Sequence, residues 1–85
     1  MTKVEFQFQV KIPSGPDVAR RSVELSEVPV VGDCVEILKN ELAHVVERTF
    51  LLNGVVRVKL DEREDCNASQ TAMLREAGWK FIADN

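Results

Sequence analysis

The dipeptide Asn53-Gly54 separates two apolar, β-branched runs and restricts the fold of this chain more than any other feature. Residues 45–52 read VVERTFLL and residues 55–60 read VVRVKL, and both compositions are typical of strands. Asn-Gly tolerates the positive φ that both central residues of a type I′ turn require. We therefore expect a hairpin with a two-residue loop, which would set the pairing of the two strands.

A second strong pattern lies near the N-terminus, where apolar and polar residues alternate from residue 3 to residue 12. This period of two predicts a strand with one buried and one solvated face. The expected buried residues are Val4, Phe6, Phe8, Val10 and Ile12. Residues 13–17, PSGPD, then interrupt the strand, because proline cannot donate a hydrogen bond to a ladder.

Two further strands are expected before the hairpin. Apolar and polar residues alternate within 19–26, which predicts a strand returning alongside the first. Pro29 ends this region, residues 34–38 (CVEIL) form the next strand, and residues 39–41 supply the turn that follows.

One short helix is expected close to the C-terminus. Asn67 followed by Gln70 resembles a capping box, and Gly78 stands where a C-terminal cap belongs. Trp79 is placed to pack back on the last helical turn. Residues 79–82 form either a final short strand or an apolar tail that closes the core.

These elements predict one domain over residues 1–85, of the β-rich α+β class. The expected architecture is a five-stranded antiparallel meander, either a strongly twisted sheet or a small, partly open barrel, with one short C-terminal helix. Residues 32–35, Gly-Asp-Cys-Val, resemble the Gly-Asp-x-Val entry to a strand in many small SH3-like barrels. This resemblance implies an SH3-like architecture only, and no functional residue comes with it.

Composition narrows the function classes. A net charge of −3 and a pI near 5.1 argue against a surface built entirely for phosphate, although a local basic patch fits both values. Apolar runs all fall short of the roughly 20 residues that span a bilayer, and a signal-peptide h-region is missing. We expect a cytoplasmic protein without membrane association, in which Cys34 and Cys66 stay reduced.

The expected hairpin register divides the side chains between two faces. One face has Glu47 as its one misfit and would join the core, and its other members are Val45, Thr49, Leu51, Val56, Val58 and Leu60. The other face is mixed and carries His44, Val46, Arg48, Phe50, Leu52, Val55, Arg57 and Lys59. Arg48 would lie opposite Lys59, and because such a like-charge pair destabilises a hairpin, we expect an anion nearby to compensate it.

Three sources of that anion are open. The first is internal, from Glu36 opposite His44 and from Asp61 beyond Lys59. The second is the backbone of a single-stranded nucleic acid, with Phe50 stacking on a base. The third is a carboxylate of a partner protein.

The apolar members of the mixed face leave two alternatives. Either the C-terminal helix with Trp79 or Phe81 covers them, or they form an exposed interface with a protein partner or in a homodimer. The candidate partner-binding residues are Arg48, Phe50, Leu52, Arg57 and Lys59.

Catalytic and metal-binding patterns are weak. His44 is the only histidine, and Cys34, His44 and Cys66 lack the spacing of metal ligands. We therefore expect no enzyme activity, cofactor, metal or small-molecule substrate. The sequence favours a protein-protein interaction or assembly module, and the alternative function is single-stranded nucleic-acid binding.

Overall fold

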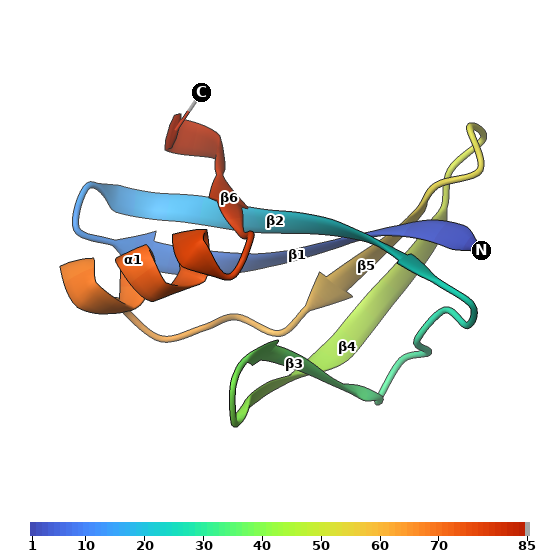
Figure 1. Cartoon of the computed structure of the whole chain (residues 1–85), viewed down its shortest axis with the longest axis horizontal. Coiled ribbons are helices and arrows are strands. Elements are labelled where there is room, and N and C mark those ends of the chain that lie inside the picture. The colour runs from blue at the N-terminus through green and yellow to red at the C-terminus, as the bar shows by residue number, and fades with distance from the viewer. Residues whose placement is uncertain (85) are drawn as a thin grey trace.

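One sheet, curled into a half-barrel, forms the body of the computed structural model, which describes residues 1–84 (Figure 1). The strands are β1 (Thr2–Ile12), β2 (Gly15–Leu25), β3 (Cys34–Leu38), β4 (Glu41–Phe50), β5 (Val56–Leu60) and β6 (Lys80–Phe81), and the helical elements are α1 (Ala68–Glu76) and the 3-10 turn η1 (Ile82–Asp84). Their order across the sheet is β3-β4-β5-β1-β2-β6. The β-rich class with one short α-helix near the C-terminus is confirmed.

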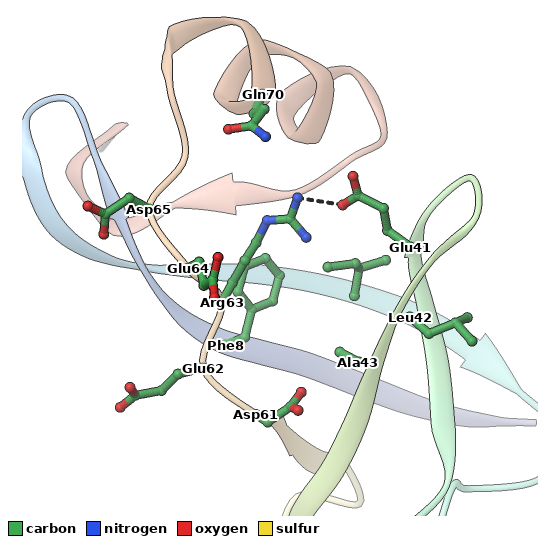
Figure 2. Close-up of a pocket in the computed structure, with 11 residues that line it drawn as sticks. Phe8, Glu41, Leu42, Ala43, Asp61, Glu62, Arg63, Glu64, Asp65 and Gln70 are labelled. Atoms are coloured by element: carbon green, nitrogen blue, oxygen red, sulfur yellow. Dashed lines mark ion pairs between the residues drawn. The ribbon is translucent and has the colours of Figure 1, made fainter.

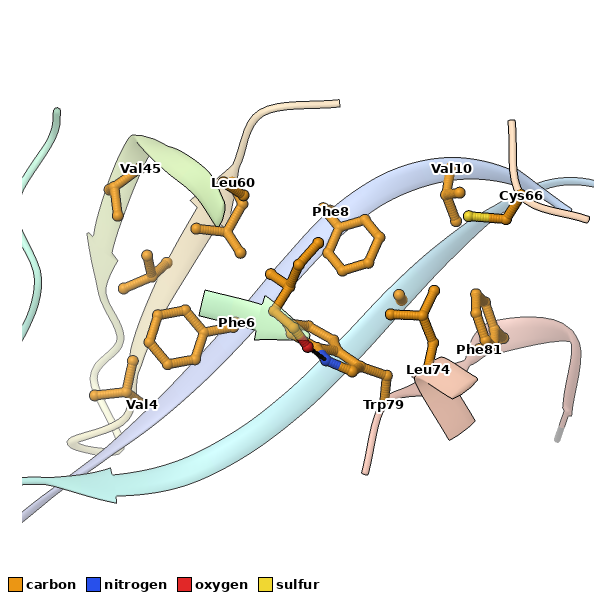
Figure 3. Close-up of a cluster of buried hydrophobic side chains, with 14 of the residues drawn as sticks. Val4, Phe6, Phe8, Val10, Val45, Leu60, Cys66, Leu74, Trp79 and Phe81 are labelled. Carbon is orange, nitrogen blue, oxygen red and sulfur yellow. Dashed lines mark hydrogen bonds between the residues drawn. The ribbon is translucent and has the colours of Figure 1, made fainter. Parts of the chain in front are cut away.

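β1 lies between β5 and β2, and its alternating pattern is confirmed. Its five inward side chains are each at most 5% exposed. Phe8 packs edge-on against the Trp79 ring, with 4.8 Å between the ring centroids. Figure 3 shows the resulting core, in which Leu74 of α1 and Phe81 of β6 complete the layer over β1.

The connections differ from the expected antiparallel meander. β2 and β3 follow one another in the chain, yet no pairing joins them within residues 1–84. The irregular segment 26–33, which includes Pro29, carries the chain from one edge of the sheet to the other. The edge of β1 away from β2 pairs instead with β5, in parallel. Residues 80–81 add a sixth strand, which pairs with β2.

Helix α1 begins as expected. The Asn67 side chain accepts from the Gln70 N–H at 2.8 Å, and the Gln70 side chain accepts from the Asn67 N–H at 3.0 Å. This reciprocal capping box satisfies two backbone donors at the helix start. Gly78 follows the helix with φ +102°, a conformation that favours glycine.

The loop of the β4–β5 hairpin was predicted wrongly. The Gly54 N–H donates to the Leu51 carbonyl at 3.1 Å and the Leu51 N–H donates to the Val55 carbonyl at 2.9 Å, so the loop comprises residues 52–54. Gly54 has φ +88°, whereas Asn53 keeps a negative φ. This pattern is a type I turn followed by a glycine bulge, not a type I′ turn.

The longer loop moves the register by one residue. Thr49 lies opposite Arg57 and Glu47 lies opposite Lys59, and a bulge interrupts the ladder between Val45 and Glu47. The expected pairing of Arg48 with Lys59 is therefore wrong, and Lys59 faces a carboxylate instead. Thr49, expected in the core, is exposed.

The register of the β3–β4 hairpin also differs from the prediction. Glu36 lies opposite Leu42, and His44 lies opposite Cys34. The reason is a short turn at Lys39 and Asn40, together with an irregularity between Glu36 and Leu38. Glu36 is thus not opposite His44, as it would have to be to supply the internal anion expected near Arg48.

Candidate functional site

The five candidate partner-binding residues do not form one patch. Residues directly opposite on neighbouring strands share a face, and Arg48 and Phe50 lie opposite buried valines of β5. They therefore project to the inner side of the half-barrel. Arg57 and Lys59 project to the outer, polar side, and Leu52 lies in the hairpin loop.

Phe50 and Leu52 are exposed, at 66% and 109% of their reference areas. The Arg48 guanidinium lies 5.0 Å from the centre of the Phe50 ring, a cation-π contact. Trp79 and Phe81, which were considered as a cover for these side chains, are buried in the core. The hairpin tip projects at the far side of the molecule from α1 (Figure 1).

The outer face of the sheet gathers positive charge that the sequence analysis missed. On β1, β2, β4, β5 and β6, cross-strand pairing brings six basic side chains to this face against three acidic ones, a net charge of +3 for these five strands in a chain whose net charge is −3. The basic residues are Lys3, Lys11, Arg20, Arg57, Lys59 and Lys80, and the acidic residues are Glu5, Glu24 and Glu47. Only the cross-strand register shows that these charges share a face, and the sequence pattern did not predict that register.

Glu5 neutralises part of this outer face. Its Oε1 lies 3.3 Å from Nε of Arg57 and 4.0 Å from Nε of Arg20. Arg57 is thus engaged within the sheet. Arg20 is a more distant partner of Glu5, and Lys59 and Lys80 make no ion pair within residues 1–84.

The half-barrel is open between β3, at one edge of the sheet, and the part of β2 that extends beyond the short β6 at the other edge. A groove of about 290 Å³ follows this opening, and its lining is mainly apolar. We call it the seam groove, and its lining residues are Phe6, Arg21, Val23, Leu25, Pro29, Cys34, Val35, Glu36 and Trp79. The side chains on its two walls therefore come from strands that no ladder connects directly within the described chain.

Trp79 closes one end of the seam. It immediately precedes β6, which pairs with β2, and its indole N–H donates to the Ile37 carbonyl of β3 at 2.9 Å. Both edges of the sheet are thereby tied together at this point. The other end, between Leu25 and Cys34, lacks such a bridge among residues 1–84.

Two charged side chains line the seam groove. Arg21 projects inward from β2 beside Phe6, is half-buried, and makes no ion pair with any other residue from 1 to 84. Glu36 is exposed on the opposite wall, and its side chain accepts from the Asn40 N–H at 3.4 Å. Cys34, also exposed in this groove, is a free thiol.

A second cavity, of about 390 Å³, lies between the β3–β4 hairpin and residues 61–65 (Figure 2). Its floor is apolar and its rim is acidic, but Arg63 crosses it to form an ion pair with Glu41. The Arg63 Nε also donates to Sγ of Cys66 at 3.1 Å. Burial lowers the pKa of Arg63, yet the hydrogen bonds to Cys66 and Glu41 outweigh it, so the pKa is raised. Arg63 therefore has a structural role here.

The acidic side chains of residues 61–65 are exposed, while the backbone of residues 61–66 is docked on β1. The backbone N–H groups of Arg63 and Cys66 donate to carbonyls of Gln9 and Lys11 at 3.0 and 2.9 Å. Across residues 1–84, no cluster of three or more histidine, cysteine or acidic side chains is placed to hold a metal ion. In the same range, no helix has the length and apolar character to cross a membrane.

Comparison with protein-family models, curated proteins and solved structures returned no match, so the SH3-like resemblance of residues 32–35 stays a prediction.

Proposed function

We propose that this chain is a non-enzymatic protein-interaction module, cytoplasmic in setting, that binds a segment of a partner protein in the seam groove. One observation supports this function. An apolar groove runs between two sheet edges that are unpaired along much of their length in residues 1–84. Unpaired edges beside apolar side chains are what a binding segment can bury.

Apolar side chains in the groove still expose surface that a partner could bury. Val23, Leu25 and Val35 pack against the core yet remain partly exposed. Burial of apolar area contributes about 25 cal/mol per Å², so these side chains favour a partner that covers them. Phe6 and Trp79 are buried and give the groove an apolar floor.

The test uses Cys34 as a reporter inside the groove. A display library of linear peptides is selected on the immobilised protein, and synthetic versions of the selected peptides are then added to the free protein. We expect them to slow alkylation of Cys34. Labelling Cys34 with a bulky maleimide should abolish binding, whereas the same label on Ser22→Cys in a Cys34→Ser background, on the outer face, should leave binding intact. Selection of no peptide, or equal effects of both labels, would contradict the proposal.

A second candidate function, nucleic-acid binding, is favoured by the charge of the outer face. The basic side chains there would contact phosphates. Aromatic residues are missing from the outward positions of the paired strands within residues 1–84, so base stacking would not contribute. This surface replaces the patch of Arg48, Phe50, Arg57 and Lys59 that the sequence suggested.

The nucleic-acid alternative is tested by titration with single-stranded RNA at low salt. Binding should weaken linearly with the logarithm of salt concentration, and Arg20→Gln or Lys59→Gln should weaken it further. Arg48→Gln, which removes a charge from the inner face, is the matched control. Absence of binding by the unmodified protein at low salt would eliminate this alternative.

A further inference from the structure

We infer that the segment bound in the seam groove is an extended strand that adds to the outer edge of β2 and carries a carboxylate for Arg21. This inference rests on the proposed function and specifies the chemistry of the partner. It is carried by the geometry of the β2 edge and by the charge of one residue in the groove.

The outer edge of β2 already accepts a strand. β6 pairs with it antiparallel at Ala19 and Arg20, and Trp79, which precedes β6, turns from this edge into the core. Residues 21–25 continue the same edge without a strand partner in the described part of the chain. An added segment would therefore lie beyond Trp79 along this edge, with its backbone hydrogen-bonded to groups that now lack a ladder.

The side chains of β2 favour a strand over a helix as the occupant. Arg21, Val23 and Leu25 face the groove, while Ser22 and Glu24 face outward. A strand presents alternate side chains to such a surface and pairs with the edge. A helix satisfies its own backbone and would leave the edge of β2 unpaired.

Arg21 gives the groove its preference for an acidic partner. Its side chain passes close to Gly78, where an added Cβ would lie 3.3 Å from the Arg21 Nε, so the neighbouring turn confines the guanidinium. A half-buried guanidinium forms strong, often bidentate, hydrogen bonds with a carboxylate. Glu36 on the opposite wall disfavours acidic residues elsewhere in the segment. We therefore expect one acidic residue among apolar ones.

The experiment analyses the linear peptides selected on the unmodified protein. We expect alternating apolar positions and one enriched Asp or Glu. Arg21→Gln should weaken the best peptide about tenfold, and replacing its acidic residue by Gln or Asn should weaken it similarly without adding to the loss. Arg21→Lys should retain part of the affinity. Arg20→Gln, a neighbouring arginine on the outer face, should change the affinity little.

Backbone pairing needs its own measurement. Two peptides are N-methylated, one at the odd-numbered amides and one at the even-numbered amides; methylation of the set whose N–H groups point to β2 should abolish binding, and methylation of the other set should spare it. Hydrogen exchange of the backbone amides of residues 21–25 should slow on binding. Peptides that protect Cys34 but are insensitive to N-methylation, or that bind Arg21→Gln equally well, would overturn this inference and leave the proposed function standing. If no peptide protects Cys34, both fail.

Discussion

The indole N–H of Trp79 donates to the carbonyl of Ile37 at 2.9 Å, in a buried position and across 42 residues of chain. This bond joins the segment at one edge of the sheet to the strand at the other edge (Figure 3). It is therefore the point at which the curl of the sheet is held. The same ring packs on Phe8, so its hydrogen-bonding and packing roles can be separated by mutation.

Trp79→Phe keeps an aromatic ring but leaves the Ile37 carbonyl without its donor. We expect a loss of about 1–3 kcal/mol in the free energy of unfolding, from the unsatisfied carbonyl and the smaller ring. Urea unfolding should be followed by circular dichroism, because Trp79 is the only tryptophan. A loss below about 0.5 kcal/mol would mean that the bond does not hold the seam.

Gly54→Ala tests the three-residue hairpin loop. Gly54 has φ +88°, and a residue with a Cβ in the left-handed region costs about 1–2 kcal/mol. Asn53→Ala, which removes the acceptor of the 3.0 Å bond from the Val55 N–H, should cost less. Cross-strand NMR contacts should pair Thr49 with Arg57. Contacts pairing Thr49 with Val58 would restore the two-residue loop.

Phe50→Ala and Leu52→Ala should leave the fold almost unchanged. Both side chains are mostly exposed, so we expect each to change the free energy of unfolding by less than about 0.5 kcal/mol. Val58→Ala, at 0% exposure, is the contrasting variant and should cost about 1–3 kcal/mol. If the mass in solution is that of a dimer and Leu52→Asp yields monomers, the hairpin tip is the homodimer interface.

The two cysteines should differ sharply in reactivity. Cys34 is exposed, whereas Cys66 is 5% exposed and its Sγ accepts from Arg63. Under native conditions we expect iodoacetamide to modify Cys34 first, with Cys66 reacting only as the protein opens. Mass spectrometry of time points gives both rates, and urea should equalise them. Equal rates without urea would show that residues 61–66 do not stay docked.

Asp84 and Arg75 form an ion pair whose effect on acidity can be measured. Hydrogen bonds from Arg75 at 3.0 and 2.9 Å lower the pKa of Asp84. Because the pKa is lower in the folded state, the pair stabilises the fold above the unfolded pKa, and this contribution is lost as the pH falls through the folded value. In an NMR titration, Arg75→Gln should raise the pKa of Asp84 and Arg75→Lys should raise it less. An unchanged pKa would contradict the pairing.

Local patterns predicted the elements with short-range causes. The alternation in β1 and the capping box at Asn67 and Gln70 act within a few residues, and both are present as expected. The candidate site was less accessible to such reasoning. An error of one residue in the loop after Leu51 moved Arg57 and Lys59 to the face opposite Arg48 and Phe50.

The groove was beyond sequence analysis because its walls come from strands that are adjacent in the chain but unpaired in space. Residues 26–33 permit either a paired turn or a passage across the end of the sheet. The parallel pairing of β5 with β1, with Val4 opposite Val56, places β3 at one edge and β2, with the short β6 beside it, toward the other. Parallel pairing between distant segments carries no local sequence signal.

The sequence by itself determined that the chain is rich in strands, which face of β1 is buried and where α1 begins, because these depend on side-chain period and local hydrogen bonds. The tertiary structure alone decided the register of the β4–β5 hairpin, the positive outer face and the seam beside Arg21. These follow from loop conformation, a bulge and long-range pairing, whose energies depend on the whole core and not on any short segment.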